Sequence, residues 1–375
     1  MLKIISGGQV APTLMLYART PLSQIPPYPR TPYPECCKLS HHSLGSFSSL
    51  GHRFKTMSEE KTYIYVTGGR LRGKTLGCVE RFSFEKDEWQ TQPRMQESRG
   101  SHGAAALGAT LIVVGGGGFK SNLSTVEMLL CENNSNDNND SSNETSSSYS
   151  RWTNIAPLTT HRHALGVQLF REDSVFAIGG WMNGSECSGA VEKYDLKLNA
   201  WSHCSPLLSP RRLHGTAALH NSSEIFVFGG NREDGDWYTA SVESYDVAGD
   251  CWRECNDLPL AGPCSAATVR CPRSNDEKIF VFMHGNAVYR YNHIEDSYEK
   301  LSALPLPEWF CFDVVAIDLD IYAVGGAQKG KWSNAFYRYK TESDVWEELP
   351  RMRKERRRCA AAVVRIPDTL FPLAI

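Results

Sequence analysis

Three histidines hold the most chemically suggestive positions in this sequence of 375 residues. His102, His163 and His214 lie at the starts of three segments of small residues, and neutral imidazole is a common metal ligand and a common catalytic acid or base. His102 and His214 occupy the same position of a repeat, which suits a packing role equally well. Because no carboxylate stands where it would converge on the three rings, the sequence predicts neither a metal site nor a catalytic group here.

Two other patterns have suitable residue types but unsuitable spacing. Cys36 and Cys37 lie close to His41 and His42, but not at the intervals of a zinc site. The four glycines at 115–118 are not followed by the Lys and Ser/Thr of a phosphate-binding loop. No Ser, His and Asp arrangement can be argued either, so we predict no catalytic residue, no metal and no cofactor.

A basic run lies near the C-terminus, where residues 351–358 contain six positive charges. Such a run could be a nuclear address or a nucleic-acid patch. It falls, however, on a predicted turn, where Arg356 is already explained by a repeat. The formal net charge of the chain is −2 and shows no overall bias towards nucleic acid. We therefore predict a surface loop and no nucleic-acid partner.

The elements that must position these residues are short hydrophobic runs, five of which end in a glycine pair. Runs of this kind, bounded by turn residues and evenly spaced, predict strands of a closed all-β fold. A glycine pair allows the positive φ that a crowded strand end requires. The pairs are Gly68-Gly69, Gly115-Gly116, Gly179-Gly180, Gly229-Gly230 and Gly325-Gly326.

A second segment follows in each unit, and its closing aromatic residue stands seven residues before another aromatic residue. The later residue is large enough to fill the wedge between twisted blades. These later residues are Trp89, Trp201, Trp252, Tyr298 and Trp346. In one further unit an insertion precedes Trp152, and in another the glycine pair has become Met283-His284.

Six units of roughly fifty residues predict a six-bladed propeller with four strands in each blade. The first unit has no inner strand ahead of Tyr63, whereas a spare strand of small residues, 359–364, follows Trp346. We therefore expect the C-terminal strand to complete blade one, because this closure removes the free edges of the sheet.

The glycine pairs, the aromatic segment and the spaced tryptophan together resemble the kelch repeat proteins, over residues 62 to about 365. A family element of Pro, then Met or Leu, then Arg also matches at Arg99, Arg162, Arg211 and Arg356. Units four and five depart from that element in the segments that follow them, where Leu258-Pro259 is followed by Cys264 and Pro305 by Phe310-Cys311. The resemblance implies a kelch-type all-β propeller, with no BTB or F-box domain evident in this sequence.

Loops on a rigid scaffold concentrate binding residues. One propeller face should collect the turns after the glycine pairs and the turns that enter the inner strands, and Trp and Arg there suit interface anchors. The resemblance implies that this face grips a peptide or acidic loop. The candidate residues are Arg70, Arg72, Ser101, His102, Arg162, His163, Trp181, His214, Arg232, Trp237, Tyr238, Trp309, Trp332 and Arg358.

Segments outside the repeats complete the organisation. Residues 1–56 are predicted to be a disordered Pro/Ser-rich leader or an upstream extension, 57–368 the propeller, and 369–375 a tail. Residues 132–150 are a low-complexity loop inserted in blade two. No apolar stretch is long enough to span a membrane, and the twelve cysteines suit free thiols in a reducing compartment. We expect a cytoplasmic protein, with the nucleus as the alternative.

The function predicted is a protein-interaction module, either a substrate-recognition or a scaffolding subunit. The resemblance implies a cullin-type ubiquitin ligase reached through a separate adaptor, or actin, as partners. The alternative is a small-molecule enzyme of the kelch class, an oxidase, mutarotase or specifier, using the axial pocket. The Glu-x3-Asp-x3-His pattern of the iron-dependent specifiers is absent from the sequence.

Overall fold

The computed structural model describes residues 60–118, 121–133, 151–171, 173–182, 186–232, 237–285 and 287–367. All regular elements within these ranges are β-strands, and they form six blades. The predicted all-β six-bladed propeller is thus confirmed. The expected leader 1–56, the tail 369–375 and all but the first two residues of the 132–150 insertion lie outside the described residues.

Each blade is an antiparallel sheet whose strands follow one another outward from the axis. Blade one contains β27 (Ala360–Pro367), β1 (Glu60–Thr67), β4 (Val79–Ser83) and β5 (Glu88–Gln92). Blade two contains β6 (Gly103–Leu107), β7 (Thr110–Val114), β8 (Val126–Leu130) and β9 (Thr153–Ile155). Blade three contains β10 (Gly166–Phe170), β11 (Ser174–Ile178), β12 (Val191–Asp195) and β13 (Ala200–Cys204).

The remaining blades repeat this order. Blade four contains β14 (Gly215–Leu219), β15 (Glu224–Phe228), β16 (Val242–Asp246) and β17 (Cys251–Cys255). Blade five contains β18 (Cys264–Arg270), β19 (Glu277–Met283), β20 (Val288–Asn292) and β21 (Ser297–Lys300). Blade six contains β22 (Trp309–Ile317), β23 (Asp320–Gln328), β25 (Phe336–Lys340) and β26 (Val345–Glu348).

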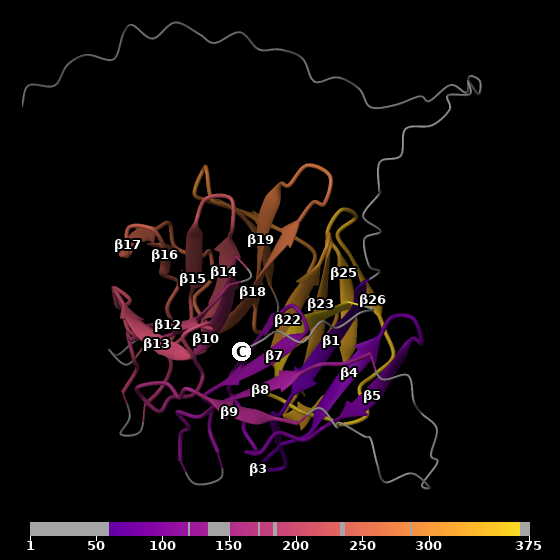
Figure 1. Cartoon of the computed structure of the whole chain (residues 1–375). Helices are drawn as coiled ribbons and strands as arrows, with labels where there is room; N and C mark the ends of the chain where they lie inside the picture. Colours follow the sequence, from indigo (N-terminus) through magenta and orange to yellow (C-terminus); the bar gives the residue numbers. More distant parts are fainter. Residues whose placement is uncertain are drawn as a thin grey trace, which may run out of the picture. The chain divides into compact units, whose positions relative to one another are not determined.

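Closure of the ring takes place in blade one, as predicted. β27 pairs with β1 from Glu60↔Pro367 to Thr67↔Ala360. In Figure 1 the yellow strands of blade six lie beside the indigo strands of blade one, so the ends of the propeller meet. The side chains of Val364 and Ile366 are buried in the hydrophobic cluster between blades one and two. β27 is thus the inner strand of blade one and covers the inner edge of β1.

The glycine pairs adopt the positive φ angles that the sequence predicts. Gly68 has φ 52° and Gly69 has φ 104°. A Cβ atom on Gly68 would lie 2.4 Å from the carbonyl oxygen of Arg99, so a larger residue is excluded by contact as well as by backbone strain. The chain can therefore turn sharply where β1 ends.

The aromatic residues of the outer strands join neighbouring blades. The Trp152 indole N–H donates to Pro93 O at 2.9 Å, and the Trp252 indole N–H donates to Ser205 O at 2.8 Å. In blade five the Tyr298 hydroxyl replaces the indole and donates to Asn256 O. Each bond ties a blade to the chain leaving the preceding blade, which supports the predicted role between blades.

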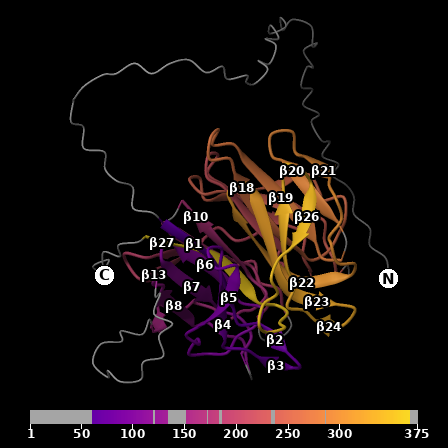
Figure 2. The same ribbon diagram turned by 90° about the vertical axis from the view of Figure 1, so that its right-hand side faces the viewer.

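Short strands extend two of the loops that follow glycine pairs. β2 (Arg70–Leu71) and β3 (Lys74–Thr75) form a hairpin after Gly69, and β24 (Lys331–Trp332) pairs with the end of β23. Figure 2 shows β2, β3 and β24 together along one side of the ring. These loops build the face described below.

Candidate functional site

The two predicted sets of loops meet on one face of the propeller, which we call the post-glycine face. In each pairing, the residue after a glycine pair bridges to a residue just ahead of an inner strand. The bridges are Arg70↔Arg357, Gly100↔Gly117, His163↔Trp181 and Arg212↔Asn231, and the Phe310↔Ala327 pair of blade six is equivalent. The face is therefore a ring of backbone-paired rungs that holds its side chains in fixed positions.

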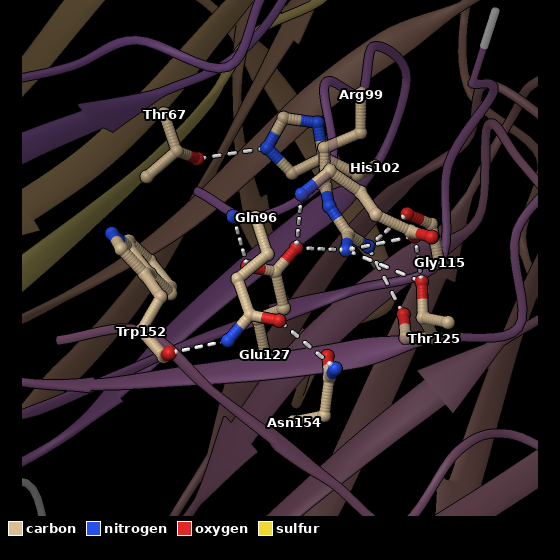
Figure 3. Close-up of polar contacts among 10 residues, drawn as sticks. Thr67, Gln96, Arg99, His102, Gly115, Thr125, Glu127, Trp152 and Asn154 are labelled. Atoms are coloured by element: carbon tan, nitrogen blue, oxygen red, sulfur yellow. Dashed lines mark hydrogen bonds and ion pairs between the residues drawn. The ribbon is translucent and has the colours of Figure 1, made fainter. Parts of the chain in front are cut away.

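A buried arginine anchors most of these rungs from below. Figure 3 shows Arg99 donating to Gly115 O at 2.8 Å and to the carboxylate of Glu127 at 2.5 Å. The other oxygen of Glu127 accepts the backbone N–H of Gln96. Both side chains are fully buried, so each charge is stabilised by the other instead of by water.

The same ion pair recurs in three more blades. Its members are Arg162 with Glu192, Arg211 with Glu243, and Arg356 with Glu80. Each arginine also donates to the first glycine of the next pair, at Gly179, Gly229 and Gly68. The repeat arginine is therefore a structural clamp, and its glutamate partner went unrecognised in the sequence.

Blade six uses a different donor at the same place. The Trp309 indole N–H donates to Gly325 O at 2.8 Å, and the ring is fully buried. Tyr337 stands where four other blades have glutamate, and its ring lies 5.8 Å from that of Trp309. A buried arginine without its carboxylate would be costly, so both members of the pair have changed together.

Five residues with unusual backbone conformation surround the mouth of the axial channel. Ser101, Ala164, Leu213, Cys311 and Arg358 have φ between 54° and 57°, which is uncommon for residues other than glycine. Together with Cys264 we call them the mouth ring. Five N–H···O bonds run round it, from Arg358 N to Cys311 O, Ser101 N to Arg358 O, Ala164 N to Ser101 O, Leu213 N to Ala164 O and Cys264 N to Leu213 O.

The axial channel behind the mouth ring has a volume of about 460 Å³ and is lined by the inner strands. Burial, with the positive charge of Arg211 and Arg162, lowers the pKa of His214 to about 3. Burial likewise lowers the pKa of His102, whose Nε2 is hydrogen bonded to Thr67 Oγ1 at 2.8 Å. Both rings are neutral at physiological pH and pack against the glycine-terminated strands.

A metal-binding arrangement is not present in the part of the chain that the structure describes. Over those residues, no three His, Cys, Asp or Glu side chains gather closely enough to hold an ion. Asp313 lines the channel and accepts the backbone N–H of Ala361 at 2.8 Å. Burial raises its pKa to about 6.

Five of the predicted binding residues are buried beneath the post-glycine face. Arg162 precedes Ala164 of the mouth ring by two residues, and its side chain points into the blade, where it pairs with Glu192. The five are Arg162, Trp309, Ser101, His102 and His214. Their role in the structure is to shape the rungs and the channel wall, and we remove them from the proposed contact surface.

The other predicted residues are at least partly exposed on the post-glycine face. Trp237 is 70% exposed and Tyr238 55% exposed. The guanidinium group of Arg212, which the prediction omitted, lies 3.6 Å from the ring centroid of Trp181, and that of Arg357 lies 5.7 Å from the ring of Trp332. The full set is Arg70, Arg72, His163, Trp181, Arg232, Trp237, Tyr238, Trp332 and Arg358.

No disulfide is formed by the ten described cysteines, of which Cys264 and Cys359 are buried and Cys311 is partly exposed. Among the described residues no helix has the length and apolar character needed to cross a membrane.

Comparisons with known proteins agree with this geometry. Kelch motif models match residues 61–96, 172–208 and 308–353. Kelch-like protein 11 of Homo sapiens is 24% identical over 81% of this chain and 43% of its own length. Kelch-like protein 36 of Bos taurus is 24% identical over 57% of this chain and 33% of its own. Kelch-like protein 38 of Rattus norvegicus is 32% identical over 35% of this chain and 22% of its own.

The chain thus spans less than half the length of these curated relatives. The matched motifs fall in blades one, three and six, and the other three blades repeat the same strand order. With its six blades, its glycine pairs and its C-terminal closing strand, the chain is a kelch-repeat β-propeller.

Proposed function

We propose that the post-glycine face binds a negatively charged peptide or loop of a partner protein. The observation that carries this proposal is the group of Arg70, Arg357 and Arg358, for which no carboxylate partner exists among the described residues. A guanidinium group held at the surface without an internal counter-ion favours carboxylate or phosphate ligands. The rigid rungs support the proposal because they fix the side chains before a partner arrives.

Exposed aromatic residues on the same face would add apolar anchoring. Trp237 and Tyr238 follow the glycine pair of blade four and expose most of their side chains. Exposed aromatic side chains with a polar end are favoured at interfaces. We propose that an acidic segment lies across the arginines while an apolar side chain of the partner contacts this aromatic pair.

The cellular role that we propose is substrate recognition or scaffolding. The kelch resemblance suggests service to a cullin-type ubiquitin ligase through a separate adaptor. One curated relative, a cowpox virus protein 28% identical over 51% of this chain, is named as a kelch repeat and BTB domain-containing protein. The absence of disulfides among the described cysteines is consistent with a reducing compartment, and we propose a cytoplasmic location.

Quantitative capture tests the proposal. Wild-type protein and the Trp237→Ala and Arg358→Ala variants are used side by side to purify partners from cells, and mass spectrometry counts each protein retained. A binding module should retain a defined partner whose recovery falls at least tenfold with either variant. Recovery that neither variant changes would remove the post-glycine face as the binding surface.

The same experiment separates the alternatives. Ligase components or actin among the proteins lost with Arg358→Ala would identify the kind of assembly. A small molecule that stays bound after purification, and whose binding neither substitution changes, would instead favour an enzyme that uses the axial channel.

A further inference from the structure

Three arginines gather where blade six meets blade one, and we call them the blade-one arginine cluster. Arg70 N donates to Arg357 O at 2.8 Å, and Arg357 N donates to Arg70 O at 3.1 Å. Arg358 follows directly and belongs to the mouth ring, with φ 54°. The backbone therefore brings three arginines together, and one of them, Arg358, lines the axial channel.

The cluster lacks internal neutralisation within the described residues. The Nε atoms of Arg70, Arg357 and Arg358 are buried and have no hydrogen-bond partner there. The Nε atom of Arg356 is also without a partner, but its terminal nitrogens are bonded to Glu80 and to Gly68 O. Arg70, Arg357 and Arg358 have no such ion pair among the described residues. A desolvated donor without a partner is costly, and like charges held together add to that cost.

A pair of glycines makes room for one of the three side chains. The Gly100↔Gly117 rung of blade two lies beside the Arg70↔Arg357 rung of blade one. A Cβ on Gly117 would lie 2.7 Å from Arg70 Nη2, and one on Gly100 would lie 2.7 Å from Arg70 Cγ. Neither glycine has positive φ, so a larger residue at either position would first meet the side chain of Arg70 and displace it.

The electrostatic effect of the cluster reaches the next rung. Burial, with the positive charges of Arg358 and Arg357, lowers the pKa of Arg70. Burial, with the charges of Arg358, Arg70 and Arg212, lowers the pKa of His163 to about 4. Positive potential therefore extends over blades one to three, and an anion bound there would relieve it.

We propose that the blade-one arginine cluster is the subsite for a phosphorylated serine or threonine of the bound partner, a proposal that rests on the proposed peptide-binding function. One carboxylate supplies a single negative charge against three guanidinium groups. A phosphate monoester supplies about −1.5 to −2 and three acceptor oxygens. Arginine binds such oxygens through paired N–H groups, so a dianion matches the cluster better than Asp or Glu does.

Arrayed peptides test this charge preference on the full chain. Peptides with identical flanking sequences carry phosphoserine, glutamate or serine at one central position, and binding is measured by fluorescence polarisation. We expect the best phosphoserine peptides to bind about tenfold or more tightly than their glutamate counterparts. Arg70→Ala and Arg358→Ala should abolish that difference. Arg273→Ala removes an exposed arginine at the turn between β18 and β19 and should preserve it.

A glycine substitution distinguishes geometry from total charge. Gly117→Ala keeps all three arginines but displaces the Arg70 guanidinium, so it should reduce the phosphoserine preference severalfold. Gly189→Ala is the matched control, because a Cβ there meets only ordinary contacts, the nearest at 3.4 Å. Equal melting temperatures of the two variants would show that neither effect comes from unfolding.

Each alternative outcome has a distinct reading. If no phosphoserine peptide binds better than its glutamate counterpart, the dianion subsite is wrong. Binding of inorganic phosphate without any phosphopeptide would overturn the peptide as the source, and displacement of the peptides by a short oligonucleotide at equal ionic strength would assign the cluster to nucleic acid. Partner capture that Arg358→Ala abolishes but phosphatase treatment does not change would overturn this inference and leave the proposed function standing.

Discussion

Arg356 and Glu80 form a buried ion pair although 276 residues separate them in the chain. The pair belongs to the same set as Arg99 with Glu127, but it spans the junction between blade six and blade one. It therefore adds a side-chain connection to the backbone closure that β27 provides. Glu80 also accepts the backbone N–H of Arg353 at 2.8 Å.

Glu80→Gln should destabilise the propeller by about 3 kcal/mol, because it leaves the Arg356 charge buried without a counter-ion. Chemical denaturation of wild type and variant measures the difference. Glu299→Gln is the control, since that carboxylate is 56% exposed in its ion pair with Arg290; we expect a change within about 0.5 kcal/mol. Similar losses in both variants would show that the buried pair is not special.

Removal of residues 359–375 should open blade one and expose the edge of β1. The deletion takes away the whole of β27 and with it the buried Val364 and Ile366. Val364→Asp tests the same packing without truncation, because an unpaired carboxylate in that core is strongly unfavourable. Either change should lower the melting temperature by many degrees. A truncated chain that melts cooperatively at the wild-type temperature would contradict closure by β27.

Acidification should weaken the fold between about pH 6.5 and 4. Burial, with the charge of Arg358, lowers the pKa of His284 to about 4, whereas the unfolded chain has a histidine pKa near 6.5. The unfolded state thus binds the proton first as pH falls, and the free energy of unfolding decreases, by roughly 1 to 3 kcal/mol for this ring. Urea denaturation at pH 7 and pH 4.5 should show a smaller decrease for His284→Asn.

Asp313 should act in the opposite direction. Its pKa of about 6 exceeds the ordinary value near 3.9, so the folded state binds the proton first and gains stability as pH falls from about 6 to 4. Asp313→Asn should therefore lose more stability on acidification than wild type does. If His284→Asn and Asp313→Asn follow the wild-type pH curve, neither group titrates as its surroundings indicate.

Two tryptophans of blade four should respond differently to truncation. Trp237→Ala should weaken partner binding by roughly 1 to 4 kcal/mol and leave the melting temperature unchanged, because the ring is largely exposed. Trp252→Ala should lower the stability by about 2 to 4 kcal/mol, since its indole is bonded to Ser205 O and lies 4.9 Å from the ring of Tyr245. The reverse pattern would place the contact surface elsewhere.

The fold was predictable because its signals are local and repeated. Glycine pairs and spaced tryptophans each report a backbone or packing need that recurs in five of the six blades, and the strand order recurs in all six. The missing strand before Tyr63 and the spare strand after Trp346 were sufficient to predict closure. Comparison of the units also contained the signal for the ion pairs: glutamate is absent at Tyr289 and Tyr337, in the same blades whose preceding loops lack the repeat arginine.

The site was harder to predict because the direction of a loop side chain depends on the backbone conformation of that loop in the folded protein. Arg162 and Arg358 both belong to inner-strand entries, yet one points into a blade and the other lies at the channel mouth. The difference follows from their places relative to the positive-φ residue, which the sequence does not mark. The space above Gly100 and Gly117 likewise becomes visible only when Arg70 is seen to occupy it.

The pairing of Glu60 with Pro367 determines how the propeller would respond to force. Both residues lie at the end of blade one remote from the post-glycine face, because β1 runs from Glu60 towards Gly68. Tension applied at these two positions would pull on adjacent partners of an antiparallel ladder and break its hydrogen bonds one pair at a time. The protein should therefore unzip at low force in an optical trap, while a surface attachment at either position would leave the post-glycine face free.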